Sequence, residues 1–166
     1  MLDEFLGIYN QTMDRVNAKD SYYFGREYFA RIAQLPGVHC CIIKSGPTIL
    51  AASIFFECGG IIQLHLGGTR TEFLSTSPFN MILYDMIHWA KSRGNRWLHL
   101  GGGVGGEDDS LLRFKAGFSP TRFHFQTARL IINEVKYRQL VDLKAQAVQL
   151  TSEMTFDSNF FPAYRS

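Results

Sequence analysis

Leu64-His65-Leu66-Gly67-Gly68 occurs a second time as Leu98-His99-Leu100-Gly101-Gly102. Each copy ends a run of β-favouring residues, and one helix-like stretch separates the two. A strand, a helix and a further strand in this order form a right-handed crossover with parallel strands. The copies should therefore lie at neighbouring carboxyl ends, where α/β sheets bind ligands. Chance is the alternative explanation, because a pentapeptide is short.

Upstream of the first copy, the sequence predicts three strands at residues 38–44, 48–57 and 61–67. Turns of a few residues, Ser45-Gly46-Pro47 and Cys58-Gly59-Gly60, separate them. Connections this short join antiparallel neighbours, so we expect a meander. Apolar residues recur at three- and four-residue steps in residues 2–18 and 26–35, which predicts two preceding helices.

Downstream, Ser77-Pro78 is a typical helix start, with serine as the N-cap and proline in the first turn, and Gly94 a typical end. Further elements are expected at residues 96–100 (strand), 109–116 (helix), 122–130 (strand) and 134–150 (helix), with Asp108, Asp109 and Ser110 as the candidate cap of the 109–116 helix. Together these predict an α+β (α/β/α) fold with a mixed sheet. Residues 1–150 should form one domain, on which the tail 151–166 docks.

Composition is that of an ordinary globular protein, with 46% hydrophobic and 19% charged residues among 166. A net charge of +2 is too small to favour nucleic acid through bulk electrostatics. The longest apolar run, residues 48–56, is too short to span a bilayer. Cys40, Cys41 and Cys58 lie in or beside expected strands, so we expect buried free thiols in a cytoplasmic protein. No metal-ligand spacing is present.

The order of elements resembles a GNAT acyltransferase domain without its first strand. Local sequences resemble, within that superfamily, the C-terminal lobe of the FemABX peptidoglycan aminoacyltransferases. They include Tyr9-Asn10-Gln11-Thr12-Met13-Asp14-Arg15, Ser77-Pro78-Phe79-Asn80 and Phe160-Phe161-Pro162-Ala163-Tyr164-Arg165. The most specific is Phe114-Lys115-Ala116-Gly117-Phe118, which is similar to a Phe-Lys-x-x-Phe signature. The resemblance covers nearly the whole chain.

This resemblance implies that the strands at 61–67 and 96–100 splay apart and hold an acyl donor between them. It implies transfer of an acyl or aminoacyl group from acyl-CoA or aminoacyl-tRNA to an amine of a cell-wall precursor, peptide or amino sugar. No tightly bound cofactor is implied. FemABX proteins have two lobes and this chain has room for one, so it is expected to be a fragment, a degenerate paralogue or a half that dimerises.

Candidate site residues follow from the resemblance and from residue chemistry. Lys115, beside Phe114, is implied to stabilise negative charge on the tetrahedral intermediate. His65 is a candidate base because histidine titrates near neutral pH. Donor binding is expected at Leu66, Gly67, Gly68, Ser77 and Asn80, and substrate binding at His99, Tyr164 and Arg165. For each residue a purely structural role is the alternative: a solvated lysine, strand-ending glycines, hydrogen-bonded histidines or a docked tail.

One departure from the GNAT pattern favours a second hypothesis. Enzymes of this superfamily that use acyl-CoA usually carry a glycine-rich loop that holds the pyrophosphate, and residues 70–77 contain no glycine. The chain could then be a non-catalytic binding or assembly module that has lost its donor site.

Overall fold

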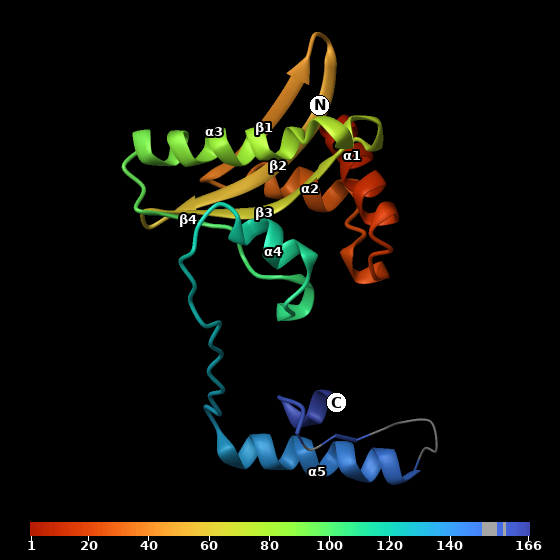
Figure 1. The fold of residues 1–166 in the computed structure, drawn as a ribbon. Helices are drawn as coiled ribbons and strands as arrows, with labels where there is room; N and C mark the ends of the chain where they lie inside the picture. The colour runs from red at the N-terminus through yellow and green to blue at the C-terminus, as the bar shows by residue number, and fades with distance from the viewer. Residues whose placement is uncertain (151–155, 158) are drawn as a thin grey trace. The chain divides into compact units, whose positions relative to one another are not determined.

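The computed structural model describes residues 1–150, 156–157 and 159–166. They form two compact units, Met1–Pro120 and Thr121–Ser166 (Figure 1). The first unit contains the sheet and four of the helices. The second contains one long helix and the end of the chain.

A four-stranded sheet in the order β1-β2-β3-β4 organises the first unit. Its strands are β1 (Val38–Ser45), β2 (Thr48–Cys58), β3 (Ile61–Thr69) and β4 (Trp97–His99). The first three form an antiparallel meander, and β4 pairs with β3 in parallel. These pairings confirm the predicted α+β fold and its crossover unit.

Helices cover both faces of the sheet (Figure 1). The first unit contains α1 (Leu2–Arg15), α2 (Arg26–Ile32), α3 (Pro78–Ser92) and α4 (Ser110–Ala116). The second unit contains α5 (Glu134–Leu150). Alternation along β2 separates two cores, because successive side chains of a strand point to opposite faces. Ala52 and Ile54 pack with α1 and α2, whereas Ala51 and Phe55 pack with α3.

The ends of α3 lie where the sequence predicts them. Pro78 occupies its first turn, and Gly94, with φ of +78°, follows its end. The capping mechanism was wrong, however, because the Ser77 side chain makes no capping hydrogen bond and its backbone is left-handed, with φ of +49°. A non-glycine residue in that region carries backbone strain.

Glu57, near the end of β2, joins three elements. Its carboxylate accepts hydrogen bonds from Arg93 just after α3 (3.0 Å), from Asn95 (2.8 Å) and from His39 of β1 (2.8 Å). The bonds from Arg93, then Asn95 and His39, lower the pKa of Glu57 to about 2. Trp89 packs between His39 and Arg93, with ring centres 4.6 Å from the imidazole and 4.9 Å from the guanidinium carbon. This network attaches the carboxyl end of α3 to the sheet.

Two further expectations were wrong. Residues 122–130 form no strand, although Phe123 and Phe125 alternate with polar residues. Alternation favours a strand only where a neighbouring strand supplies main-chain partners. Cys40 and Cys58 are exposed rather than buried, since one lies on a terminal strand and the other ends β2, while Cys41 is half-buried; all three are free thiols.

In the second unit, the end of the chain packs on α5. Tyr137 of α5 accepts a hydrogen bond from the Ala163 amide at 3.1 Å, and its ring lies against Tyr164 and Phe161. The predicted boundary at residue 150 stays a prediction. Its tail includes residues 151–155 and 158, which are outside the described residues.

Glu57→Gln should lower the melting temperature at pH 7, because the neutral amide loses the charge-assisted bonds to Arg93 and Asn95. The folded pKa is depressed from the ordinary 4.5 to about 2. The stability that the carboxylate contributes is therefore present above pH 4.5 and lost as the pH falls towards 2. Calorimetry of both proteins across this range should show the difference in melting temperature shrinking on acidification.

Glu72→Gln is the matched control, because Glu72 is an exposed carboxylate. It should leave the melting temperature nearly unchanged at every pH. A Glu57→Gln difference that stays constant between pH 7 and pH 2 would contradict the assigned role of the charge.

Candidate functional site

The site lies where β3 and β4 part. They pair at only three positions, Ile61 with Trp97, Ile62 with Leu98 and Gln63 with His99. β3 continues to Thr69, but β4 ends at His99 and the chain turns at Gly101, where φ is +75°. The first pentapeptide copy, which begins at Leu64, follows the last paired residue of β3, whereas the second begins inside the pairing at Leu98. The two copies therefore both lie towards the carboxyl ends of the parallel pair, but two residues out of register.

A β-bulge marks the point of separation. On β2, Ile54 lies opposite Leu66 and the next residue, Phe55, lies opposite Leu64, so His65 is the extra residue of β3. Bulges take main-chain groups out of the regular ladder and redirect side chains, often beside active sites. Here His65 and Leu66 both contact the side of the sheet that α1 and α2 cover. The sequence pattern gave no sign of this bulge.

His65 is half-buried and hydrogen-bonded. Its Nε2 lies 2.8 Å from the Tyr28 hydroxyl of α2, and its ring packs against Phe56 at 4.7 Å. Burial lowers the pKa of His65 below its ordinary value. A neutral imidazole with a hydroxyl beside it can accept a proton at neutral pH. Tyr28 was not among the predicted site residues. The sequence feature that could have indicated it is the group of aromatic residues on α2, to which Tyr28 belongs.

Gly67 and Gly68 are each required by close packing. A Cβ atom at Gly67 would lie 2.6 Å from the hydroxyl of Ser53, which itself donates to the Leu66 carbonyl at 3.0 Å. A Cβ atom at Gly68 would collide with Thr12 and lie 2.8 Å from the Ile8 carbonyl oxygen of α1. Protein atoms, rather than open space, occupy both Cβ positions. The predicted donor contact of these glycines would have to use their main chain.

Lys115 turns inward from α4. Its ammonium donates to the Gly102 carbonyl at 2.6 Å, at the end of the second pentapeptide. Burial lowers the pKa of Lys115, while the charge of Asp109 acts in the opposite direction. Asp109 caps α4 as predicted, accepting hydrogen bonds from the Leu112 and Val104 amides at 2.8 and 2.9 Å. The lysine is thus held beside β4 as a partly desolvated cation.

Phe114 connects α4 with the start of α3. Its ring lies 6.4 Å from Phe79 and 5.4 Å from Phe118. Phe79 belongs to the first turn of α3, between the predicted donor residues Ser77 and Asn80, which are both exposed. The contact brings α4, with the predicted residues Phe114 and Lys115, beside the start of α3, with the predicted residues Ser77 and Asn80.

The anion-binding capacity of this region is limited. The amino end of a helix attracts negative charge, but Pro78 has no amide hydrogen to donate. The nearby guanidinium of Arg70 donates to the Ile49 carbonyl at 2.8 Å. A pyrophosphate would therefore rely on the first turn of α3 and not on a loop of glycine amides.

The predicted substrate-binding residues belong to two different units of the chain. His99 is exposed at the end of β4, and because Leu98 packs beside α3, alternation directs His99 to the opposite face. Tyr164 and Arg165 belong to the second unit, where the Tyr164 ring packs against Tyr137 at 5.8 Å. The roles proposed for these three residues stay predictions.

Two kinds of feature are absent from the part of the chain that the structure describes. Among them, no three histidine, cysteine or acidic side chains gather as metal ligands. None of the helices in that part of the chain has the length and apolar character needed to cross a bilayer.

Residues 1–115 match the family described as "Acetyltransferase (GNAT) domain". No curated protein matches the chain in sequence. The family match confirms the expected GNAT domain over more than half of the chain. It does not distinguish a FemABX lobe, so that closer resemblance stays a prediction.

Solved structures share the fold at low identity. The tetramutant of BH1408 protein from Bacillus halodurans has a TM-score of 0.56 at 13% identity, over 78% of this chain and 93% of that chain. The aminoglycoside acetyltransferase meta-AAC0020 from an uncultured soil metagenomic sample, in complex with sisomicin, has 0.56 at 12%, over 80% and 89%. AAC(6')-Iy in complex with a bisubstrate analog has 0.52 at 12%, over 78% and 92%. Likeness at this level establishes the fold alone.

Gly68→Ala should destabilise the protein by about 1–3 kcal/mol, the usual cost of an inserted methyl group in a packed core. The added atom would collide with Thr12 and displace α1 from β3. Urea unfolding monitored by circular dichroism measures this loss.

Gly7→Ala provides the control, because a Cβ atom there has nothing within 4 Å. Since Gly7 lies inside α1, alanine should stabilise the protein by about 0.5–1 kcal/mol. Equal effects of the two substitutions would show that α1 does not pack this closely on β3.

Proposed function

Because the chain belongs to the GNAT acetyltransferase family, we propose that it transfers an acyl group from coenzyme A to the amine of a small molecule. The observation that carries this proposal is the early end of the β3–β4 pairing, beside the bulge at His65. The thioester lies along the unpaired length of β3. The amine approaches from the face that α1 and α2 cover.

The reaction requires a neutral amine and a polarised carbonyl. The amine nitrogen attacks the thioester carbon, a C–N bond forms, and the carbonyl electron pair moves to oxygen. Main-chain amides at the bulge of β3 donate to that oxygen. The electron pair then returns from oxygen to re-form the carbonyl, the C–S bond breaks, and the thiolate of coenzyme A leaves with its electron pair and takes a proton from solvent.

The amine loses its proton to Tyr28 and His65 acting together. The hydroxyl oxygen lies 2.8 Å from Nε2, so Tyr28 can pass its own proton to the imidazole while accepting one from the amine. Burial lowers the pKa of His65, which keeps the imidazole neutral and ready to accept. The acceptor is thus recognised beside the aromatic side chains of α2.

Lys115 supports the developing negative charge from the β4 side. Its ammonium already donates to Gly102, which positions the charge at the end of that strand. A partly desolvated cation stabilises an anion more strongly than one in water does. The contact between the Phe114 and Phe79 rings places α4, which carries Lys115, beside the first turn of α3.

More specific donors and acceptors can be proposed. If the FemABX resemblance holds, aminoacyl-tRNA replaces acyl-CoA, and the amine belongs to a cell-wall precursor, peptide or amino sugar. Aminoglycosides form a further acceptor class, because one solved relative is an aminoglycoside acetyltransferase in complex with sisomicin. Three free thiols suit a cytoplasmic location, where such donors occur.

A non-catalytic lobe is the second candidate. Residues 70–77 lack glycine, Pro78 offers no amide and Arg70 is bonded elsewhere, so the pyrophosphate contact is reduced. Calorimetric titration with acetyl-CoA and equilibrium binding of aminoacyl-tRNA discriminate the two candidates. Binding of either donor supports the enzyme, whereas binding of neither supports the module.

Tyr28→Phe should lower kcat about tenfold or more while leaving KM for the donor nearly unchanged, because it removes the hydroxyl that transfers the proton. In the parent, kcat/KM should decline as the pH is lowered, because His65 becomes protonated. The midpoint of this decline should lie below pH 6.5, the ordinary pKa of histidine, because burial lowers the pKa of His65. His65→Gln should abolish that decline.

Tyr23→Phe serves as the matched control, because the Tyr23 hydroxyl donates to Asp14 at the surface. It should leave the kinetics unaltered. A decline that survives in His65→Gln would exclude His65 as the base.

Lys115→Met should lower kcat by roughly 10- to 1,000-fold, the range expected when one stabilising charge is lost. The methionine keeps the length and apolar stem of lysine, so the melting temperature should change little. Lys91→Met, at an exposed position of α3, should retain parental rates. Parental activity in Lys115→Met would exclude the lysine from the mechanism.

A further inference from the structure

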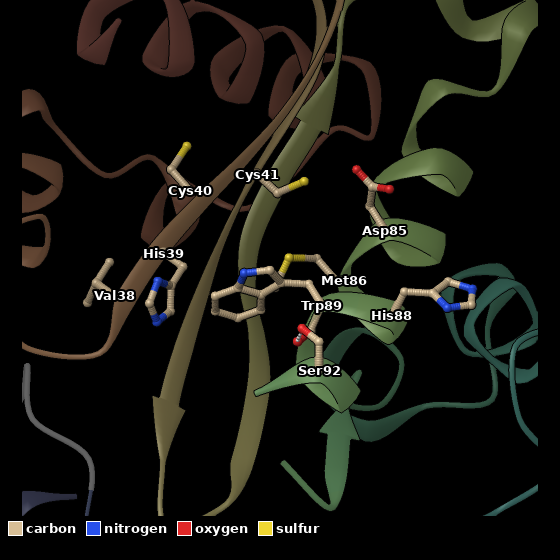
Figure 2. Close-up of a pocket in the computed structure, with 9 residues that line it drawn as sticks. All are labelled: Val38, His39, Cys40, Cys41, Asp85, Met86, His88, Trp89 and Ser92. Atoms are coloured by element: carbon tan, nitrogen blue, oxygen red, sulfur yellow. Dashed lines mark hydrogen bonds between the residues drawn. The ribbon is translucent and has the colours of Figure 1, made fainter. Parts of the chain in front are cut away.

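We propose that Ser53 of β2 is a positioning residue for acyl transfer, because its hydroxyl orients and polarises the peptide group between Leu66 and Gly67. That peptide presents the Gly67 amide to the carbonyl oxygen of the bound thioester. The inference rests on the proposed function and identifies the side chain that positions its main-chain donor. It concerns the middle of the sheet and not the pocket between β1 and α3, whose lining includes His39 and Trp89 (Figure 2).

Ser53 is a polar residue in an apolar strand. It is the one polar residue between Ile49 and Phe56, and it is 0% exposed. A buried hydroxyl needs a hydrogen-bond partner. The Ser53 hydroxyl donates to the carbonyl oxygen of Leu66 at 3.0 Å, beside the bulge of β3. The bond therefore reaches β3 just beyond its last residue paired with β4.

The peptide bond transmits this contact to Gly67. The Leu66 carbonyl and the Gly67 amide belong to one planar trans peptide, so they point in opposite directions. Ser53 holds the carbonyl on the side of β2, and the amide consequently points away from β2. A hydrogen bond to the carbonyl also polarises the peptide and makes its N–H a stronger donor.

The register of the β2–β3 pair supports this direction. In an antiparallel pair, residues that exchange main-chain hydrogen bonds alternate with residues whose main-chain groups face outward. The Arg70 amide donates to the Leu50 carbonyl at 2.9 Å, so these two residues form a hydrogen-bonded pair. Counting back along the regular register, the main-chain groups of Thr69 and Gly67 face outward.

Thr69 agrees with this count. Its amide donates to the Thr12 hydroxyl at 3.2 Å, and its carbonyl accepts from the Arg15 guanidinium at 3.3 Å. These α1 side chains therefore take the place of a neighbouring strand at Thr69. β4 supplies no partner opposite Gly67, since its pairing with β3 ends at Gln63. Gly67 is half-buried whereas Thr69 is buried, so the outward amide of Gly67 lies in the part of β3 that a donor can approach.

Selective labelling of the parent with carbonyl-13C leucine and 15N glycine tests the contact by NMR. Leucine precedes glycine at three places, so the labelled peptides are those of Gly7, Gly67 and Gly101. Acetyl-CoA without an acceptor should move the Gly67 amide proton downfield, because the acyl carbonyl accepts from it. Coenzyme A is the matched control, because it lacks the acyl group, and it should leave this resonance near its free position.

Ser53→Ala should lower kcat about tenfold, less than the loss of a whole oxyanion donor, while KM for acetyl-CoA changes little. In the labelled variant, the Leu66 carbonyl resonance should move upfield and the acyl-dependent shift of Gly67 should shrink. Tyr9→Phe is the matched control, because Tyr9 is also a buried residue whose hydroxyl donates to a main-chain carbonyl, that of Tyr22, at 2.6 Å. It should keep the parental kcat.

The outcomes separate this role from the proposed reaction. Parental kcat in a folded Ser53→Ala protein, an equal loss of kcat in Tyr9→Phe, or equal Gly67 shifts with acetyl-CoA and coenzyme A would overturn the role of Ser53 and leave the reaction standing. A parent that binds no acetyl-CoA would overturn the proposed function and this role with it. If Ser53→Ala fails to fold, the comparison of the two ligands in the parent still decides, because it needs no variant.

Discussion

The first unit depends on how far two neighbouring parallel strands remain hydrogen-bonded. Three residue pairs join β3 to β4, and the last is Gln63 with His99. Continued pairing would fill the space beyond them with main chain and leave no room for a ligand. The extra residue at His65 belongs to the same constraint, because a bulge at this point redirects β3 just where it loses its neighbour. The space for the candidate site is therefore created by the course of the backbone, and the side chains then line it.

The two ends of the sheet serve different purposes. At the end where β2 finishes, Glu57 gathers Arg93, Asn95 and His39 into one charged network that attaches α3 to the strands. At the opposite end, contacts between aromatic rings bring α4 to the first turn of α3. Ion pairs and hydrogen bonds thus hold the end that has no proposed chemistry. Aromatic packing joins the helices at the end where the proposed chemistry lies.

Much of the fold could be predicted from the sequence, because it depends on the preferences of residues that are close together in the chain. Turn residues and strand propensity located the meander, and Ser77-Pro78 with Gly94 located α3 within a residue at each end. The repeated pentapeptide correctly predicted the parallel pair. The bulge at His65 and the Tyr28 hydrogen bond could not be predicted, since both depend on which residues face each other across elements distant in sequence. The strand predicted at residues 122–130 was wrong for the same reason. Alternating residues favour a strand, but the local sequence does not show whether a neighbouring strand is present to pair with it.

Gly67 and Gly68 change how glycine in this fold should be interpreted. Position 68 faces the main chain of α1 so closely that no side chain fits, and position 67 faces Ser53. A relative that keeps α1 in this place must keep a glycine opposite it, whatever molecule it modifies and even if it modifies none. Glycine at these positions is consequently a marker of architecture. Its presence in a sequence identifies relatives of the fold without separating working catalysts from inactive descendants.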